Sequence, residues 1–348
     1  MRRRSASSCW TVVAVAIGSI ICIFSSMAAA DDPGDQNGAV FVMTNSTNPI
    51  RGNEVAMYHR SEKGDLSLIG FFPTGDLSEG KPQLGSGPSP TAQVFKIASG
   101  GALPLVSANL DGLGSSHSLI LSRDHQCLFA VNAGSNSLSS FRVQRDGLSL
   151  ASVEGSDGTF PVSLTIHRNI LFVLNSGDQG SIAGFQVSEY DCTVVPLGQS
   201  GMASLQGYTD TFTPPAPGEV LTTPAQISFT QDGALLLVSI KGGDAKFAAD
   251  GSLLALPSGR VMVFPVKGRG ALGAGVVTPF SFANGTGGPF SFVFSGPRTV
   301  IIVNANSSTV GAYSINSSNQ LTPTGNPISI PHFASCWIVR SGNYIYTV

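Results

Sequence analysis

The chain has few charged residues and no concentration of charge of one sign. Only 11% of its 348 residues are Asp, Glu, Lys or Arg, and the formal net charge is −2. No basic run follows Arg2, Arg3 and Arg4, so neither nucleic acids nor anionic membranes are expected as partners. The sequence also has no P-loop and no GxGxxG after an expected strand, and we expect no cofactor.

Motifs of metal and nucleophile chemistry are equally scarce. There is no HExxH, no run of paired Asp and Glu, and no Cys/His cluster, so we expect no metal site. The Gly85–Gly87 segment has the wrong flanks for a GxSxG turn, which excludes a nucleophile elbow.

Long hydrophobic runs are limited to one, and it lies at the N-terminus. Thr11–Phe24 is an apolar run of 14 residues, which is short for a transmembrane span. Three arginines precede it and Ala28–Ala30 follow it, as in a secretory signal peptide. We predict a signal at residues 1–30 and a secreted, extracellular domain at residues 31–348; an uncleaved anchor is the alternative.

Cysteine is rare, with five in the chain. Cys9 and Cys22 would leave with the signal, and Cys127, Cys192 and Cys336 remain without a CxxC pair. We interpret most of these as buried small hydrophobic residues. An oxidising compartment permits one disulfide, and the spacing does not specify its pairing.

Four Asn-x-Ser/Thr sequons fall in expected loops or turns, as in a surface-glycosylated secreted protein. They are at Asn45, Asn284, Asn306 and Asn316.

Glycine is plentiful, with 41 residues, and it punctuates a repeated hairpin. The motif is apolar-x-x-Phe/Tyr-x-Val/Ile, followed by a Gly/Asp/Asn-rich turn, and a second hairpin precedes each copy. Asn132 and Asn175, at corresponding positions, are 43 residues apart. Four short strands at such a period predict an all-β fold, a β-propeller of four-stranded blades. The motif occurs at 138–143, 182–187, 261–266 and 310–315.

The repeats divide the chain into blades. We place five units at residues 39–73, 116–155, 161–198, 224–278 and 289–330. A sixth unit starts at Ala334 and stops inside its second strand at Val348. We therefore expect a propeller truncated in its C-terminal blades, or a ring that closes imperfectly. Residues 92–108 resemble an outer hairpin and are either part of an extra blade or an insertion.

The long connections indicate a working face. They span residues 75–115, 199–223 and 241–259, and all emerge on the same side because successive strands alternate in direction. At this face the first strands of the blades begin with a polar column. We predict that it binds a small oxygen-rich ligand, whereas a plain lining of a water-filled channel is the alternative. The column comprises Ser118, Ser163, Gln226, Ser291 and Trp337.

His117 precedes this column, and we predict that it faces the site as a general base or as a donor to a carboxylate; a purely structural histidine is the alternative. Lys241 is the candidate cation for a ligand carboxylate. His332 is expected near the same face, His125 and His167 at the opposite face, and His59 on an outer strand. Acidic candidates on the long loops are Asp210, Glu219, Asp244 and Asp250, beside Lys246, and solvated loop charges are the alternative for each.

The chain resembles the lactonase family of seven-bladed β-propellers, which includes propeller-type 6-phosphogluconolactonases and carboxymuconate cyclases. The resemblance rests on segments such as GLGSSHSLILSRDHQCLFAVNAGSNSLSSFRV and CWIVRSGNYIYTV and extends over about residues 39–348. It implies two further strands in the sixth unit, a seventh blade, and hydrolysis or formation of a small carboxylated or sugar lactone. It also implies acidic residues near Ile240 and Asn304, where this chain has none. The alternative is therefore a non-catalytic propeller that binds a glycan or a protein. We expect a monomer.

Overall fold

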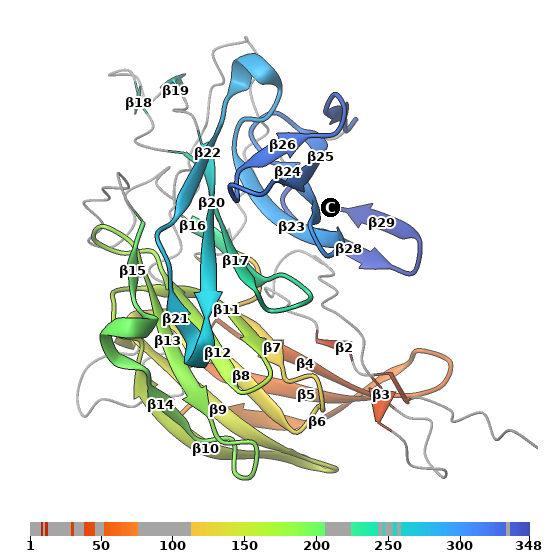
Figure 1. Ribbon diagram of the computed structural model, residues 1–348. Helices are drawn as coiled ribbons and strands as arrows, with labels where there is room; N and C mark the ends of the chain where they lie inside the picture. Colours follow the sequence, from red (N-terminus) through yellow and green to blue (C-terminus); the bar gives the residue numbers. More distant parts are fainter. Residues whose placement is uncertain are drawn as a thin grey trace, which may run out of the picture.

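The structure is a computed structural model. It describes residues 38–45, 52–75, 113–205, 224–242, 259–331 and 335–348, together with the backbone of five strands of two or three residues elsewhere. These parts of the chain contain no α-helix, and their residues form successive antiparallel sheets (Figure 1). The all-β propeller expected from the repeats is confirmed.

The first three blades follow the predicted boundaries closely. Blade one has β4 (Gly38–Met43), β5 (Glu54–Arg60) and β6 (Leu66–Pro73), and the short β2 (Thr11–Val12) pairs in parallel with β4. Blade two has β7 (Leu119–Leu121), β8 (Cys127–Asn132), β9 (Ser137–Gln144) and β10 (Gly147–Gly155). Blade three has β11 (Pro161–His167), β12 (Ile170–Asn175), β13 (Ser181–Val187), β14 (Val194–Pro196) and β15 (Ala203–Ser204).

Blades four to six continue the same order. Blade four has β16 (Pro224–Phe229), β17 (Leu235–Ile240), β20 (Gly259–Lys267), β21 (Ala271–Leu272) and β22 (Val276–Phe280). Blade five has β23 (Pro289–Gly296), β24 (Thr299–Asn304), β25 (Thr309–Ile315), β26 (Leu321–Pro323) and β27 (Ile328–Ser329). The two strands expected in the sixth unit are β28 (Ile338–Ser341) and β29 (Tyr344–Thr347).

The remaining elements are short. β1 (Ser8–Cys9) pairs with β3 (Ala29–Ala30), and β18 (Lys246–Phe247) pairs with β19 (Leu253–Ala255). Single 3-10 turns lie at Ala133–Ser135, Gly198–Gly201, Gly268–Gly270 and Phe282–Asn284. The hairpin expected at residues 92–108 lies outside the described residues. No helix in the described chain is long and apolar enough to cross a membrane.

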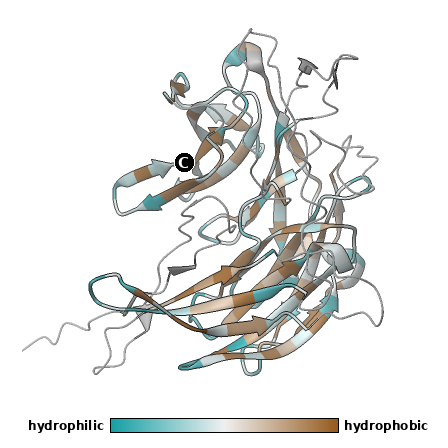
Figure 2. Cartoon of the chain, turned by 180° about the vertical axis from the view of Figure 1, so that it is seen from behind, coloured by the Kyte–Doolittle hydropathy of each residue, from teal (hydrophilic) through white to brown (hydrophobic). Residues whose placement is uncertain are grey.

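The middle strands form the core because both of their faces are covered by neighbouring blades. β8 and β17 are buried along their whole length, and their sequences are nearly continuous apolar runs. Outer strands are polar or partly exposed, and the hydropathy colouring shows apolar residues gathered on the stacked strands (Figure 2). Phe172 of blade three and Phe229 of blade four lie with ring centroids 5.4 Å apart. Such contacts stack the blades through their apolar faces.

The inner strands bring successive blades together. β11 packs against β7 and β8, β16 against β11 and β12, β23 against β16 and β17, and β28 against β23. The starts of these strands therefore lie close to one another, and this proximity positions the candidate site.

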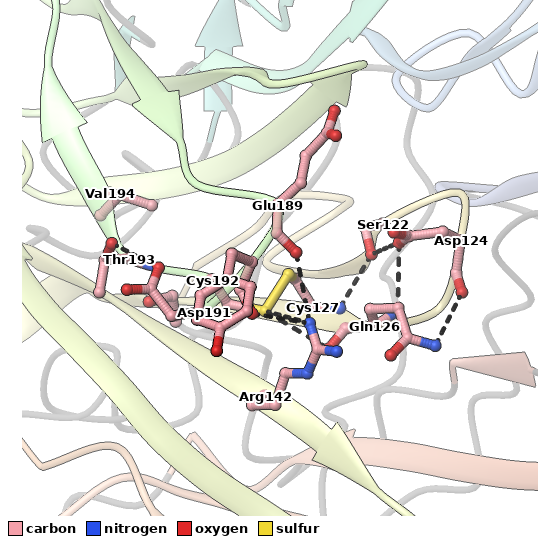
Figure 3. The surroundings of a disulfide bond; sticks show 12 residues. Ser122, Asp124, Gln126, Cys127, Arg142, Glu189, Asp191, Cys192, Thr193 and Val194 are labelled. Atoms are coloured by element: carbon pink, nitrogen blue, oxygen red, sulfur yellow. Dashed lines mark hydrogen bonds between the residues drawn. A yellow bond between two sulfur atoms is a disulfide. The ribbon is translucent and has the colours of Figure 1, made fainter.

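A disulfide joins blade two to blade three, which corrects our interpretation of most cysteines as separate buried residues. Cys127 at the start of β8 and Cys192 in the turn before β14 are bonded, with their Cα atoms 5.5 Å apart (Figure 3). The pairing requires two blades to stack face to face, because the two cysteines are 65 residues apart in sequence.

Candidate functional site

The segment Leu113–Ser118, which we call the lead-in segment, precedes β7 and lies where the inner strands converge. Consecutive carbonyl oxygens of this segment accept hydrogen bonds from different blades. The Gly114 oxygen accepts from Lys241 Nζ, and the Ser115 oxygen accepts from Trp337 Nε1 at 3.1 Å. The Ser116 oxygen accepts from Ser163 Oγ at 2.6 Å. Blades three, four and six thus hold one short stretch of backbone in place.

Lys241 is the deepest cation of this region. It follows β17 directly, is only 1% exposed, and donates to the carbonyl of Gly114. Its Nζ also lies 4.7 Å from the centroid of the Phe290 ring, a cation–π distance. A buried ammonium requires such partners because desolvation disfavours its charge. Lys241 thus lies beside the lead-in segment, with its Nζ between a backbone carbonyl and an aromatic ring face.

Two aromatic rings adjoin this charge. Phe290, from blade five, and Trp337, just before β28, lie edge to face with centroids 5.5 Å apart. Trp337 is half-buried, and its indole nitrogen is anchored on the lead-in segment. An aromatic surface beside a cation suits a ligand that has both an apolar ring face and a negative group.

His117 is the titratable side chain of the lead-in segment. Its backbone is in the left-handed region, with φ 65°, which a non-glycine residue rarely adopts and which is enriched at functional sites. The residue keeps a partly exposed surface, but desolvation lowers the pKa of its imidazole to about 4, partly offset by a hydrogen bond with the Ile227 backbone. The imidazole is therefore neutral near pH 7, with one nitrogen able to accept a proton.

The polar column is present at the starts of the inner strands, but two of its members bond backbone rather than face outward. Ser163 Oγ accepts from the Ile227 N–H at 3.1 Å. The Gln226 amide both donates to the Phe292 oxygen, at 2.9 Å, and accepts from the Phe292 N–H, at 3.0 Å. The innermost strand of each blade has no neighbouring strand along the edge that faces the propeller axis. The backbone N–H and C=O groups on that edge therefore need other hydrogen-bond partners. These side chains supply the partners across the boundary between blades.

The other members of the column are also buried or anchored. Ser118 is 8% exposed, Ser291 is 1% exposed, and Trp337 holds the Ser115 carbonyl. Sequence reasoning found the column because hydrogen-bonding side chains replace aliphatic ones there. The sequence could not predict that the carbonyl oxygens of Gly114 and Ser115 belong to the same cluster, because every residue has a backbone carbonyl and its hydrogen-bond partner depends on the fold.

Several other candidates are placed away from this cluster or lie outside the described residues. His125 and His167 lie in or beside turns at the other ends of the strands, as expected, and His59 is on β5. Ile240 and Asn304 are both fully buried, and Asn304 Nδ2 donates to Thr309 Oγ1 at 3.1 Å. The described residues contain no group of three His, Cys, Asp or Glu suited to a metal. Outside the described residues are His332, Asp210, Glu219, Asp244, Asp250 and the side chain of Lys246.

The four sequon asparagines differ in accessibility. Asn284 and Asn316 are exposed, and Asn45 lies two residues beyond the end of β4 at Met43. Asn306 is different because its Nδ2, the atom that would carry a glycan, is buried and the side chain packs closely against Gly288. A glycan at Asn306 would therefore require this side chain to move away from Gly288.

Comparison with known proteins adds independent findings. The family model described as lactonase, 7-bladed beta-propeller, matches residues 117–338. No curated protein matches the chain. A solved structure from Lactobacillus plantarum superposes with a TM-score of 0.53 at 16% identity, over 89% of this chain and 76% of that one. The periplasmic gluconolactonase of Pseudomonas aeruginosa superposes with a TM-score of 0.52 at 20% identity, over 83% of this chain and 68% of that one. At these identities the superpositions show a shared fold.

Proposed function

Because the chain belongs to the lactonase family of seven-bladed β-propellers, we propose that it hydrolyses a small lactone at the lead-in segment. The observation that carries the proposal is the placement of a neutral histidine and a buried ammonium on one short stretch of backbone. His117 belongs to that stretch, and Lys241 is bonded to Gly114, three residues before it. A base and a fixed positive charge are the two groups that lactone hydrolysis needs.

In the proposed reaction, water attacks the carbonyl carbon of the lactone, and the free imidazole nitrogen of His117 takes a proton from that water. The carbonyl oxygen becomes negative, and the Lys241 ammonium stabilises it by its charge. The ring C–O bond then breaks, and the proton on His117 passes to the departing alkoxide, which leaves an open-chain hydroxy acid. The adjacent negative charge offsets the desolvation that otherwise disfavours the imidazolium form of His117.

The substrate class follows from the neighbours of the two groups. The half-buried Trp337, packed edge to face on the buried Phe290, offers an apolar surface for a compact ring, and the charge of Lys241 favours a carboxylated or oxygen-rich one. We propose a small sugar lactone or carboxylated lactone. Gluconolactone is the first compound to assay, because the Pseudomonas aeruginosa structure is that of a gluconolactonase.

We also propose that the protein is secreted, after removal of a signal at residues 1–30, and glycosylated at exposed sequons. The disulfide between Cys127 and Cys192 supports this, because disulfides persist in oxidising compartments. The exposure of Asn284 and Asn316 is compatible with attached glycans. Intact-mass analysis of the protein purified from culture medium, with and without glycosidase, tests both points.

The enzymatic proposal is tested by following acid release from gluconolactone and muconolactone in a pH-stat, with the buffer rate subtracted. We expect a rate above buffer that falls at least about 100-fold in His117→Ala, as for loss of a general base. His59→Ala, on β5 in blade one, is the matched control and should retain the rate. Rates equal to buffer, or equal losses in the two variants, would contradict the proposal.

One observation favours a second candidate, a non-catalytic propeller that binds a glycan or protein. No carboxylate contributes to the pKa of His117, so no acid among the described residues orients the imidazole as in a catalytic pair. Glycan-array binding that is retained in His117→Ala, together with no hydrolysis of any lactone, would favour this candidate.

A further inference from the structure

A second cavity lies at the opposite face, where turns of blades three and four meet. Its volume is about 480 Å³, within the range of sites for small molecules. It is lined by the β11–β12 turn at His167–Ile170, the β16–β17 turn at Asp232–Ala234 and the end of β20 at Val266–Gly270. β11 runs from the neighbourhood of the lead-in segment to His167, so about 13 Å of strand separates Ser163 from this cavity.

Positive charge dominates the lining. Arg168, Lys267 and Arg269 line the cavity, and Asp232 is the one carboxylate among the lining residues. All three cationic side chains are exposed, and none forms an ion pair or hydrogen bond within the described chain. Asp232 offsets part of this positive charge, and its Oδ1 is held in place by accepting from Thr230 Oγ1 at 2.6 Å and from the Ala234 N–H at 3.0 Å.

Charged side chains on and near the lining act on the two titratable groups of the cavity, His167 and Asp232. The pKa of His167 is lowered from its usual value, first by burial and then by the charge of Arg168; Asp232 opposes this and Arg123 adds to it. Arg298, from the next blade, contributes to lowering the pKa of Asp232, which is set mainly by its hydrogen bonds with Thr230 and Ala234. Three cationic side chains and one carboxylate thus line the cavity, and the charges of Arg123 and Arg298 act on its titratable groups from outside the lining.

Two of the arginines are held in backbone conformations that favour glycine. Arg168 has φ 53° and Arg269 has φ 61°. Both arginines lie in tight turns, which impose this left-handed conformation and fix where each side chain leaves the backbone. The guanidinium group can bind two oxygens of a phosphate in a bidentate manner. The floor of the cavity is apolar, with Ile170, Phe229 and Val266.

We propose that this cavity binds the phosphate group of a small organic phosphate ester, as a site separate from the lactone site. The phosphate oxygens bind Arg168, Lys267 and Arg269, and the organic part packs over Phe229 and Ile170. The site is independent of the proposed hydrolysis, because none of its residues belongs to the lead-in segment or its partners.

The test is calorimetric titration of the full chain with inorganic phosphate, citrate and glucose at low ionic strength. We expect saturable binding of phosphate, weaker binding of citrate and none of glucose. In Arg168→Gln and in Lys267→Gln the affinity for phosphate should fall about tenfold, the loss of one charge-assisted hydrogen bond. Lys63→Gln, an exposed cation in the β5–β6 turn, removes the same charge elsewhere and should leave the affinity unchanged.

Arg168→Gly separates a binding role from a structural one. Glycine relieves the left-handed backbone, so the urea midpoint should rise while phosphate affinity falls. Phosphate should also raise the NMR titration midpoint of His167, because a bound anion stabilises the imidazolium. Absence of saturation with phosphate, preference for glucose or citrate, or an equal loss in Lys63→Gln would overturn the proposal. All of these readouts are independent of lactone hydrolysis.

Discussion

The disulfide between blades two and three offers a quantitative test of how the blades are held together. Replacing Cys127 and Cys192 together by alanine removes the cross-link without placing a new polar group in the buried site of Cys127. The bond closes a loop of 65 residues. The chain-entropy relation for such a loop gives about 4 kcal/mol of stabilisation through the unfolded state.

The local turn should survive this change. Arg142 Nη1 donates to the carbonyl oxygens of Glu189 and Tyr190, both at 3.3 Å, and so anchors the turn independently of the sulfur atoms (Figure 3). The native blades should therefore still form, and the loss should appear as a change in global stability. With a urea m-value of about 3 kcal/mol/M, the midpoint should fall by about 1–1.5 M.

The assay is urea unfolding followed by tryptophan fluorescence and far-UV circular dichroism. Wild type under reducing conditions should match the double alanine variant, and Cys336→Ala should match oxidised wild type, since Cys336 is not in a disulfide. A midpoint within about 0.3 M of wild type for the double variant would refute the reasoning, and so would an equal shift in Cys336→Ala.

Three further changes probe the lead-in segment and the blade boundaries. Lys241→Met should lower the free energy of unfolding by about 1–3 kcal/mol, because it leaves the buried Gly114 carbonyl without its donor; an unchanged urea midpoint would argue against that. The imidazole of His117 has a pKa of about 4 in the folded protein and about 6.5 in the unfolded chain, so protons bind preferentially to the unfolded state between these pH values. The free energy of unfolding should therefore fall by up to about 3 kcal/mol as the pH drops from 6.5 to 4. Urea titrations of His117→Asn across that window should show a shallower dependence, and an identical slope would disprove the assignment. Gln226→Leu should cost about 2 kcal/mol or more by leaving both backbone groups of Phe292 unpaired, measured by thermal and urea unfolding; a neutral effect would contradict the bridging role.

Strand positions were predictable from the sequence because the signals are local. Alternation, turn chemistry and the repeated aromatic residue placed the starts of blades three, four and five at the observed residues, Pro161, Pro224 and Pro289. The disulfide was not predictable, since the 5.5 Å approach of the two Cα atoms depends on how separate blades stack.

The candidate site was only partly accessible to sequence reasoning. His117 and Lys241 were predicted from the sequence, and in the structure His117 belongs to the lead-in segment while Lys241 donates to its Gly114 carbonyl. The roles of Ser163 and Gln226 in bridging blades were missed, because the need of an inner strand for backbone partners appears only when the blades are assembled. The second cavity was missed for a similar reason, since its walls come from turns of two different blades.

The most direct test of the proposed lactonase is the pH dependence of kcat/KM on gluconolactone, with spontaneous hydrolysis subtracted at each pH. If neutral His117 is the base in the free enzyme, the rate should rise with an apparent pKa near 4 and reach a plateau below pH 6. His117→Ala should remove that rise. A rise centred near 6.5, a profile unchanged in His117→Ala, or no enzymatic rate at any pH would contradict the account.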